Sequence, residues 1–317
     1  MRSRATVNIV FIAEGYQAGE RDQFIQDIDQ IVSSLSTLSP FRNYAGGRLA
    51  YWFHFEASQD SGPSRSAASD SHETLLGATV DSHNDAGLDL AAFERLTDSL
   101  YFVLPDTVLT SIMPGGGGPQ HQTAIVIVLM PAVETPATFL YEAGSNISQF
   151  PQNGVATDVN RNFLIMENGP GIQTVIAQQI GFQSGLRYEG VYDDPSFETP
   201  DTEQGYATAG INLLYAEPEI SPDLPYSRMW EPLTKDPDLP VADLPKIPNT
   251  SPQSPAASPL AMSMKIENLW EGGGGYQYQI YRSAEDCIMR RSIGHNTLPL
   301  RVTGLEFCPA CRQALGE

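Results

Sequence analysis

The chain has 317 residues, 41% of them hydrophobic, and a formal net charge of −20 from 38 acidic and 18 basic residues. This length can bury a sizeable core, as one large domain or as a domain with an appendage. The acidic excess argues against binding to nucleic acid or to an anionic membrane, because both carry negative charge. No apolar run approaches the ~20 residues of a membrane-spanning helix.

The first part of the chain predicts a strand, a helix and a second strand. Residues 8–13 (NIVFIA) form an apolar run with the length of a buried strand. Residues 20–38 predict a helix that Pro40 ends, because apolar side chains recur there at helical spacing. These side chains are Phe24, Ile28, Ile31 and Leu35. Aromatic residues 51–55 predict a second strand, and this order of elements is typical of an α/β fold.

The middle of the chain contains one strong strand pattern and one strong helix pattern. Residues 58–88 and 133–171 are polar and predict mostly loop, and residues 88–100 predict a second helix. Residues 124–130 (AIVIVLM) are apolar and β-branched, which predicts a central strand. A further helix is predicted from residue 172 onward by apolar residues at helical spacing, namely Ile172, Val175, Ile176 and Ile180.

Prolines set the predicted domain organisation. Eleven of the 24 prolines lie between residues 217 and 262, a density that forbids long helices and strand interiors. We therefore predict a domain of residues 1–216, a Pro-rich connecting segment of residues 217–262, and a Cys-containing C-terminal subdomain of residues 263–317 that packs on the same unit.

The helix from residue 172 has the spacing of a zinc peptidase helix without its ligands. In the motif His-Glu-x-x-His, two histidines four residues apart bind one zinc ion, and the glutamate takes a proton from the metal-bound water. Here Gln178 and Phe182 stand at the histidine positions, and Gln179 stands at the glutamate position. Taken alone, this pattern is explained much better by an ordinary buried amphipathic helix.

Three further residues of this stretch complete the comparison. Gly181 and Gly185 keep the glycine positions, Gly185 that of the turn after the helix, and both are predicted to be structural. Glu189 falls near the position of a third ligand. A glutamine side chain is a poor zinc ligand and no general base, and a phenyl ring binds no metal. Glu189 alone would not hold zinc against water.

Three separated stretches resemble the IgA-peptidase-like zinc metallopeptidase family. The first covers residues 8–24 and 40–44, and the second is Glu217-Pro218 with residues 230–233 (WEPL). The third and most specific lies at the C-terminus: residues 269–276 (LWEGGGGY), Tyr281-Arg282, residues 286–289 (DCIM) and residues 307–311 (FCPAC). Residues 58–120 match poorly, so whether they keep the family fold is open.

The resemblance implies a zincin-like fold, which is a mixed, twisted α/β sheet with an active-site-type helix and a C-terminal subdomain. It implies zinc as the family cofactor and metal-assisted peptide hydrolysis as the ancestral reaction. With Gln178, Gln179 and Phe182 in place of the ligands and the base, we expect no zinc at the cleft and a catalytically inactive homologue that binds peptides or proteins. The alternatives are an active metallopeptidase with an unrecognised metal site and a non-enzymatic surface or structural protein.

All three cysteines lie after residue 286. Cys287, Cys308 and Cys311 with His295 have ligand types that suit a structural zinc site. A disulfide of Cys287 with Cys308 or Cys311 is the alternative, and the resemblance to a secreted family favours it. That resemblance also suggests an extracellular location. The first residues do not resemble a signal peptide. A cytoplasmic protein and a mature, processed form are therefore the alternatives.

Overall fold

The computed structural model describes residues 6–43, 49–65, 71–81, 86–89, 91–93, 95–96, 122–132, 138–141, 163–169, 171–184, 186–190, 196, 198–215, 227–248, 265–284, 287–290 and 306–316. Its α-helices are α1 (Arg21–Thr37), α4 (Ile172–Gln183), α5 (Thr202–Thr208), α6 (Ser227–Trp230) and α7 (Pro309–Leu315). Short 3-10 helices are η1 (Ala18–Glu20), η2 (Phe41–Asn43), η5 (Glu231–Leu233), η6 (Val241–Asp243) and η7 (Ile288–Arg290). None of the described helices is long and apolar enough to cross a membrane.

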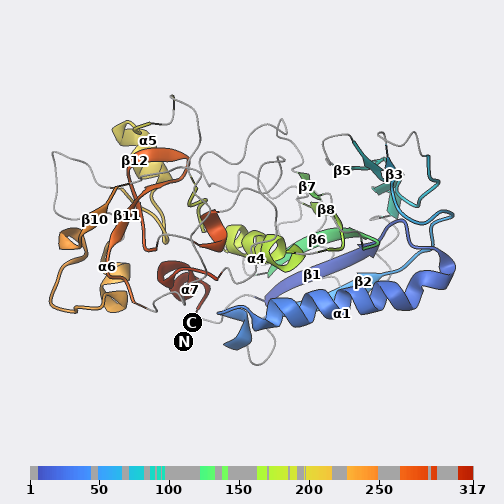
Figure 1. Ribbon diagram of the computed structural model, residues 1–317, viewed down its shortest axis with the longest axis horizontal. Helices are drawn as coiled ribbons and strands as arrows, with labels where there is room; N and C mark the ends of the chain where they lie inside the picture. Colours follow the sequence, from blue (N-terminus) through green and yellow to red (C-terminus); the bar gives the residue numbers. More distant parts are fainter. Residues whose placement is uncertain are drawn as a thin grey trace.

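A five-stranded sheet organises the N-terminal half of the molecule (Figure 1). Its strands are β1 (Thr6–Ala13), β2 (Leu49–His54), β6 (Gln122–Met130), β7 (Thr138–Tyr141) and β8 (Phe163–Glu167). They lie in the order β2-β1-β6-β8-β7, in which β7 alone runs antiparallel to its neighbour. The protein is therefore a mixed α/β protein, and β6 is the central strand that the sequence predicts.

The two faces of this sheet are covered differently. Ile9 and Phe11 of β1 pack in one apolar cluster with side chains of α1 and α4. Val10 and Ile12 point to the opposite face, as alternation along a strand requires, and pack with side chains from residues 75–96. The helices α1 and α4 contact each other, and Figure 1 shows both beside β1 and β6.

Most of the predicted elements are confirmed. The strands predicted at residues 8–13, 51–55 and 124–130 are β1, β2 and β6, and the helices predicted at residues 20–38 and from residue 172 are α1 and α4. Of the helix predicted at residues 88–100, residues 91–93 and 95–96 are helical, and residues 97–100 lie outside the described residues. The prediction of mostly loop for residues 133–171 was wrong where β7 and β8 lie. β8 is a five-residue strand inside a polar, Gly-rich stretch, and its position beside β6 in the sheet stabilises it.

A second sheet lies at the other end of the molecule and has the order β10-β11-β12-β9 (Figure 1). Its strands are β9 (Leu214–Tyr215), β10 (Lys246–Ile247), β11 (Leu269–Gly273) and β12 (Tyr276–Arg282). Gly274 and Gly275 make the β11–β12 turn with φ of 60° and 92°, which glycine adopts without strain. A third, small sheet joins β3 (Ser64–Arg65), β4 (Thr79–Val80) and β5 (Ala86–Gly87).

The predicted domain boundaries stay a prediction, and the contacts across them are extensive. β9, from residues 1–216, pairs with β12, from residues 263–317. Trp230 and Val241 of the Pro-rich segment share the large apolar cluster with β1 and α7. One continuous core therefore includes side chains from all three predicted parts.

Glu14, the residue after β1, ties residues 71–81 to the end of the sheet. Its side chain is fully buried, and its carboxylate accepts hydrogen bonds from the backbone N–H groups of Leu76 and Ala78, at 2.8 and 2.9 Å. Burial raises the pKa of Glu14 above its usual value of 4.5, although hydrogen bonds from Thr74, Ala78 and Leu76 partly oppose the rise. Glu14 therefore holds its proton more tightly in the folded protein than in the unfolded chain.

Glu14→Gln should remove one pH-dependent contribution to stability. Because the folded pKa is raised, the stabilisation from Glu14 is present below pH 4.5 and is lost as pH rises through the folded value. The stability advantage of the wild type over Glu14→Gln should therefore shrink as pH rises. Urea unfolding of both proteins at a series of pH values from below 4.5 upward measures this difference in stability. A difference that does not change with pH would contradict the raised pKa of Glu14.

Candidate metal centre

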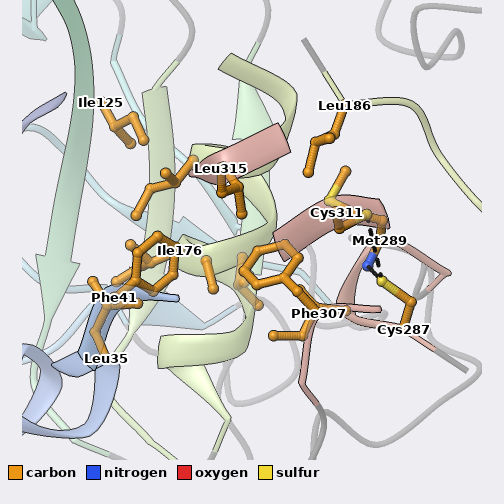
Figure 2. Packing of buried hydrophobic residues seen from close by; sticks show 14 of the residues in the cluster. Leu35, Phe41, Ile125, Ile176, Leu186, Cys287, Met289, Phe307, Cys311 and Leu315 are labelled. Carbon is orange, nitrogen blue, oxygen red and sulfur yellow. Dashed lines mark hydrogen bonds between the residues drawn. The ribbon is translucent and has the colours of Figure 1, made fainter. Parts of the chain in front are cut away.

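Helix α4 lies deep in the apolar core. Its apolar side chains Val175, Ile176 and Ile180 are at most 1% exposed. Figure 2 shows Ile176 within the packed side chains, with Phe41 on one side and Phe307 on the other. The helix begins after Gly171, whose φ is 89°, and its burial follows from the apolar spacing that predicts it.

The two glutamines at the predicted ligand and base positions are also buried. Gln178 is 2% exposed, and its side-chain nitrogen Nε2 donates a hydrogen bond of 3.0 Å to the carbonyl oxygen of Ile288. Gln179 is 4% exposed, and its Nε2 has no hydrogen-bond partner within the part of the chain that the structure describes. Phe182 packs at the edge of the large apolar cluster. These side chains contribute to the core.

Of the two predicted glycines, the structure describes Gly181 alone. Gly181 lies inside α4, two residues before its end, and not in a turn. A Cβ at this position would lie 2.5 Å from the Sδ atom of Met289, so the glycine lets η7 approach the helix closely. Gly185 lies outside the described residues, as does His295.

Glu189 follows α4 and is fully buried. Its backbone N–H donates to the carbonyl oxygen of Met289 at 2.8 Å, which fixes the loop after α4 against η7. Its side-chain oxygen Oε1 accepts a hydrogen bond from the amide of Asn212 at 2.9 Å. The other oxygen, Oε2, is buried without a hydrogen-bond partner among the described residues. Such a group is rare in a protein core and calls for an explanation.

The three cysteines surround this carboxylate. Cys287 precedes η7, whereas Cys308 and Cys311 lie at the start of α7. The sulfurs of Cys308 and Cys311 lie 3.3 and 3.1 Å from Glu189 Oε1. The sulfurs of Cys287 and Cys311 are 3.8 Å apart (Figure 2). One ligand atom from each of the four residues lies within 4.8 Å of all the others, and all four residues are buried.

Backbone N–H groups also point at the sulfurs. Cys287 Sγ accepts from the backbone nitrogens of Met289 and Cys308, at 3.4 and 3.3 Å. Cys308 Sγ accepts from the backbone nitrogen of Cys311 at 3.4 Å. Hydrogen bonds of this kind stabilise a negatively charged sulfur, and they recur around sulfur ligands of metals.

The electrostatics of the four groups are unusual. Burial raises the pKa of Glu189 well above its usual value, and the nearby Cys308 adds to the rise. Burial likewise raises the pKa of Cys287 and of Cys311. Burial also acts on Cys308, but hydrogen bonds with Cys287, Cys311 and Ser283 outweigh it and hold the pKa of Cys308 well below its usual value. Four acidic groups buried this close together cannot all be charged without a cation.

The structure thus regroups the predicted site residues. The sequence placed Glu189 with the helix positions 178 and 182, and grouped the cysteines with His295. In the structure Glu189 contacts the cysteines. No disulfide joins the three cysteines, which all lie in the described part of the chain, and the 3.8 Å between the sulfurs of Cys287 and Cys311 is far longer than the ~2.05 Å of a disulfide. The Cys-x-x-Cys spacing was a sequence signal for the cysteines, but no local signal marks Glu189 as their partner.

The sheet with its two helices on one face defines a mixed α/β protein that is compatible with an α/β peptidase fold. Residues 2–99 match the model of a metallopeptidase family, IgA Peptidase M64. This match confirms the resemblance and includes residues 58–99, where the sequence alone shows little likeness. Helix α4, Glu189 and the cysteines lie outside the matched segment, so the resemblance there stays a prediction. No curated protein matches the chain.

Proposed function

We propose that this protein is a catalytically inactive homologue of zinc metallopeptidases, with a zincin-like fold, and that it acts by binding a peptide or protein. The match of residues 2–99 to IgA Peptidase M64 supports the metallopeptidase ancestry. The main support for a loss of activity is that Gln178 is buried and its amide donates a hydrogen bond to the carbonyl oxygen of Ile288. This side chain has a structural role where a peptidase helix would have a zinc ligand.

The side chains at the predicted positions do not fit a catalytic zinc ion. The nitrogen of the Gln178 amide is occupied as a donor, and the phenyl ring of Phe182 has no donor atom for a metal. Gln179 does not ionise and cannot accept a proton from a metal-bound water. Glu189, the remaining candidate ligand, contacts two thiols and Asn212. We therefore derive no hydrolytic step at this helix.

A binding role agrees with the charge of the chain. The net charge of −20 disfavours nucleic acid and anionic membranes and favours a partner with a basic surface. An extracellular location, as the family resemblance suggests, is part of this proposal. An active peptidase would need its metal elsewhere. The Glu189–cysteine group is the metal-ligand cluster among the described residues, and its four ligands would leave no position for a catalytic water.

The purified chain should cleave neither casein nor gelatin above the level of a mock purification from host cells. Added zinc should not change this result, because the helix lacks the ligands and the base. Metal content alone does not decide the question, since a bound metal can be structural. Chelator-sensitive cleavage that coelutes with the chain would overturn the proposal, and the loss of such cleavage in Gln179→Ala would locate the site at α4.

A further inference from the structure

We propose that Glu189, Cys287, Cys308 and Cys311 form a closed, four-ligand site for a structural zinc ion. This inference is independent of the proposed function, because it uses none of the residues at the helix positions 178, 179 and 182. It rests on the positions of the four ligand atoms, their burial, and the unsatisfied oxygen of Glu189. The site would fasten the C-terminal helix α7 and η7 to the loop after α4.

The distances between the ligand atoms suit a tetrahedral zinc ion. Zinc–sulfur bonds of about 2.3 Å in a tetrahedron place two sulfurs about 3.8 Å apart. The sulfurs of Cys287 and Cys311 are 3.8 Å apart. With a zinc–oxygen bond of about 2.0 Å, sulfur and oxygen should be about 3.5 Å apart. Glu189 Oε1 lies 3.3 and 3.1 Å from the sulfurs of Cys308 and Cys311. Small movements would therefore complete the site.

The burial of the four groups also indicates a cation. Each of the four residues is 0% exposed, and Glu189 Oε1 accepts hydrogen bonds from an amide and two thiols. Its second oxygen is buried and has no partner among the described residues. Backbone N–H groups point at two of the sulfurs, as they do around metal-bound thiolates. A divalent cation would offset two of the four negative charges that the deprotonated ligands carry.

The ligand set selects the class of metal. Three thiolates are soft ligands that favour zinc or iron over calcium and magnesium, which bind oxygen atoms. Four protein ligands in a tetrahedron are typical of structural zinc sites, because catalytic zinc keeps one position for water or substrate. The ligands come from three separate segments, and Glu189 is 119 and 122 residues from Cys308 and Cys311. A metal bond between such distant residues would stabilise the fold by closing long loops.

The test is the metal content of the full chain, purified without a histidine tag and measured by elemental analysis. We expect one zinc ion per chain in the wild type and none in Cys308→Ser or Glu189→Gln. The matched control is Asp27→Asn, which alters a buried carboxylate that bonds to Tyr16 outside the cluster. This variant should keep its zinc. Removal of zinc by a strong chelator should lower the thermal midpoint of the wild type.

Two measurements on the wild type keep the proposal testable if the variants fail to fold. Replacement of zinc by cobalt should give the intense visible bands of a tetrahedral site and thiolate-to-cobalt charge transfer. Titration of the denatured, chelated protein should find three free thiols. Metal-free protein with one free thiol would show a disulfide and overturn the proposal, as would zinc retained in Cys308→Ser. Peptidase activity would overturn only the proposed function, provided that the zinc still depends on the cysteines.

Discussion

Trp230→Ala should lower the free energy of unfolding by about 3–5 kcal/mol, as large-to-small changes of buried aromatic residues do. Trp230 is fully buried in the large apolar cluster, although it lies in the Pro-rich segment. Its indole N–H donates a hydrogen bond of 2.7 Å to the carbonyl oxygen of Ile211. The substitution would leave a cavity and a carbonyl group without its partner.

Urea unfolding followed by far-UV circular dichroism measures this effect without depending on the fluorescence of the lost tryptophan. The matched control is Met229→Ala, one residue earlier on α6, because Met229 is 41% exposed. This control should change the stability by less than ~0.5 kcal/mol, as is typical of surface positions. Equal effects of both substitutions would show that the Pro-rich segment is not anchored in the core through Trp230.

Arg65→Met should lower the free energy of unfolding by about 2–4 kcal/mol, because it removes the positive charge of Arg65 from a buried carboxylate. Arg65 of β3 pairs through Nη2 with Oε1 of Glu167 at the end of β8. The Glu167 side chain is fully buried, whereas that of Arg65 is 33% exposed. Water reaches the arginine and reduces the effect below that of a fully buried pair.

A double variant and a surface pair provide the controls for this prediction. Arg65→Met with Glu167→Leu should recover much of the lost stability, since replacing both partners of a buried pair by apolar residues is often neutral. Lys235→Met removes one partner of the exposed Lys235–Glu267 pair and should change stability by less than ~1 kcal/mol. Similar losses for Arg65→Met and Lys235→Met in urea unfolding would contradict the buried-charge argument.

The proposed zinc site and helix α4 both contact one structural element, η7. The carbonyl of Ile288 in η7 accepts from Gln178 of α4, and the carbonyl of Met289 accepts from the backbone of Glu189. Cys287 stands directly before this turn and supplies a sulfur to the cluster. The hydrogen bonds of Gln178 and Glu189 to η7 therefore also help to position Cys287. Both proposals agree with a chain that keeps its fold without catalysis.

The sequence by itself determined the elements whose signal is local. The apolar spacing of α1 and α4 and the apolar runs of β1 and β6 predict these elements because helical and strand periodicities bury one face or both. The predicted elements also sufficed for an α/β fold class. The strand β8 was missed, because a five-residue run is short and its pairing with β6 and β7 in the folded sheet stabilises it.

Only the tertiary structure decided which residues form the candidate site. The sequence could identify three cysteines and a glutamate as possible ligands, but it grouped Glu189 with the helix positions 178 and 182 and not with the cysteines. Its actual contacts join residues more than a hundred positions apart, and they depend on η7 packing against Gly181 of α4. No periodicity encodes such a contact. It arises because several buried surfaces must fit together at once, and this fit is a property of the folded chain as a whole.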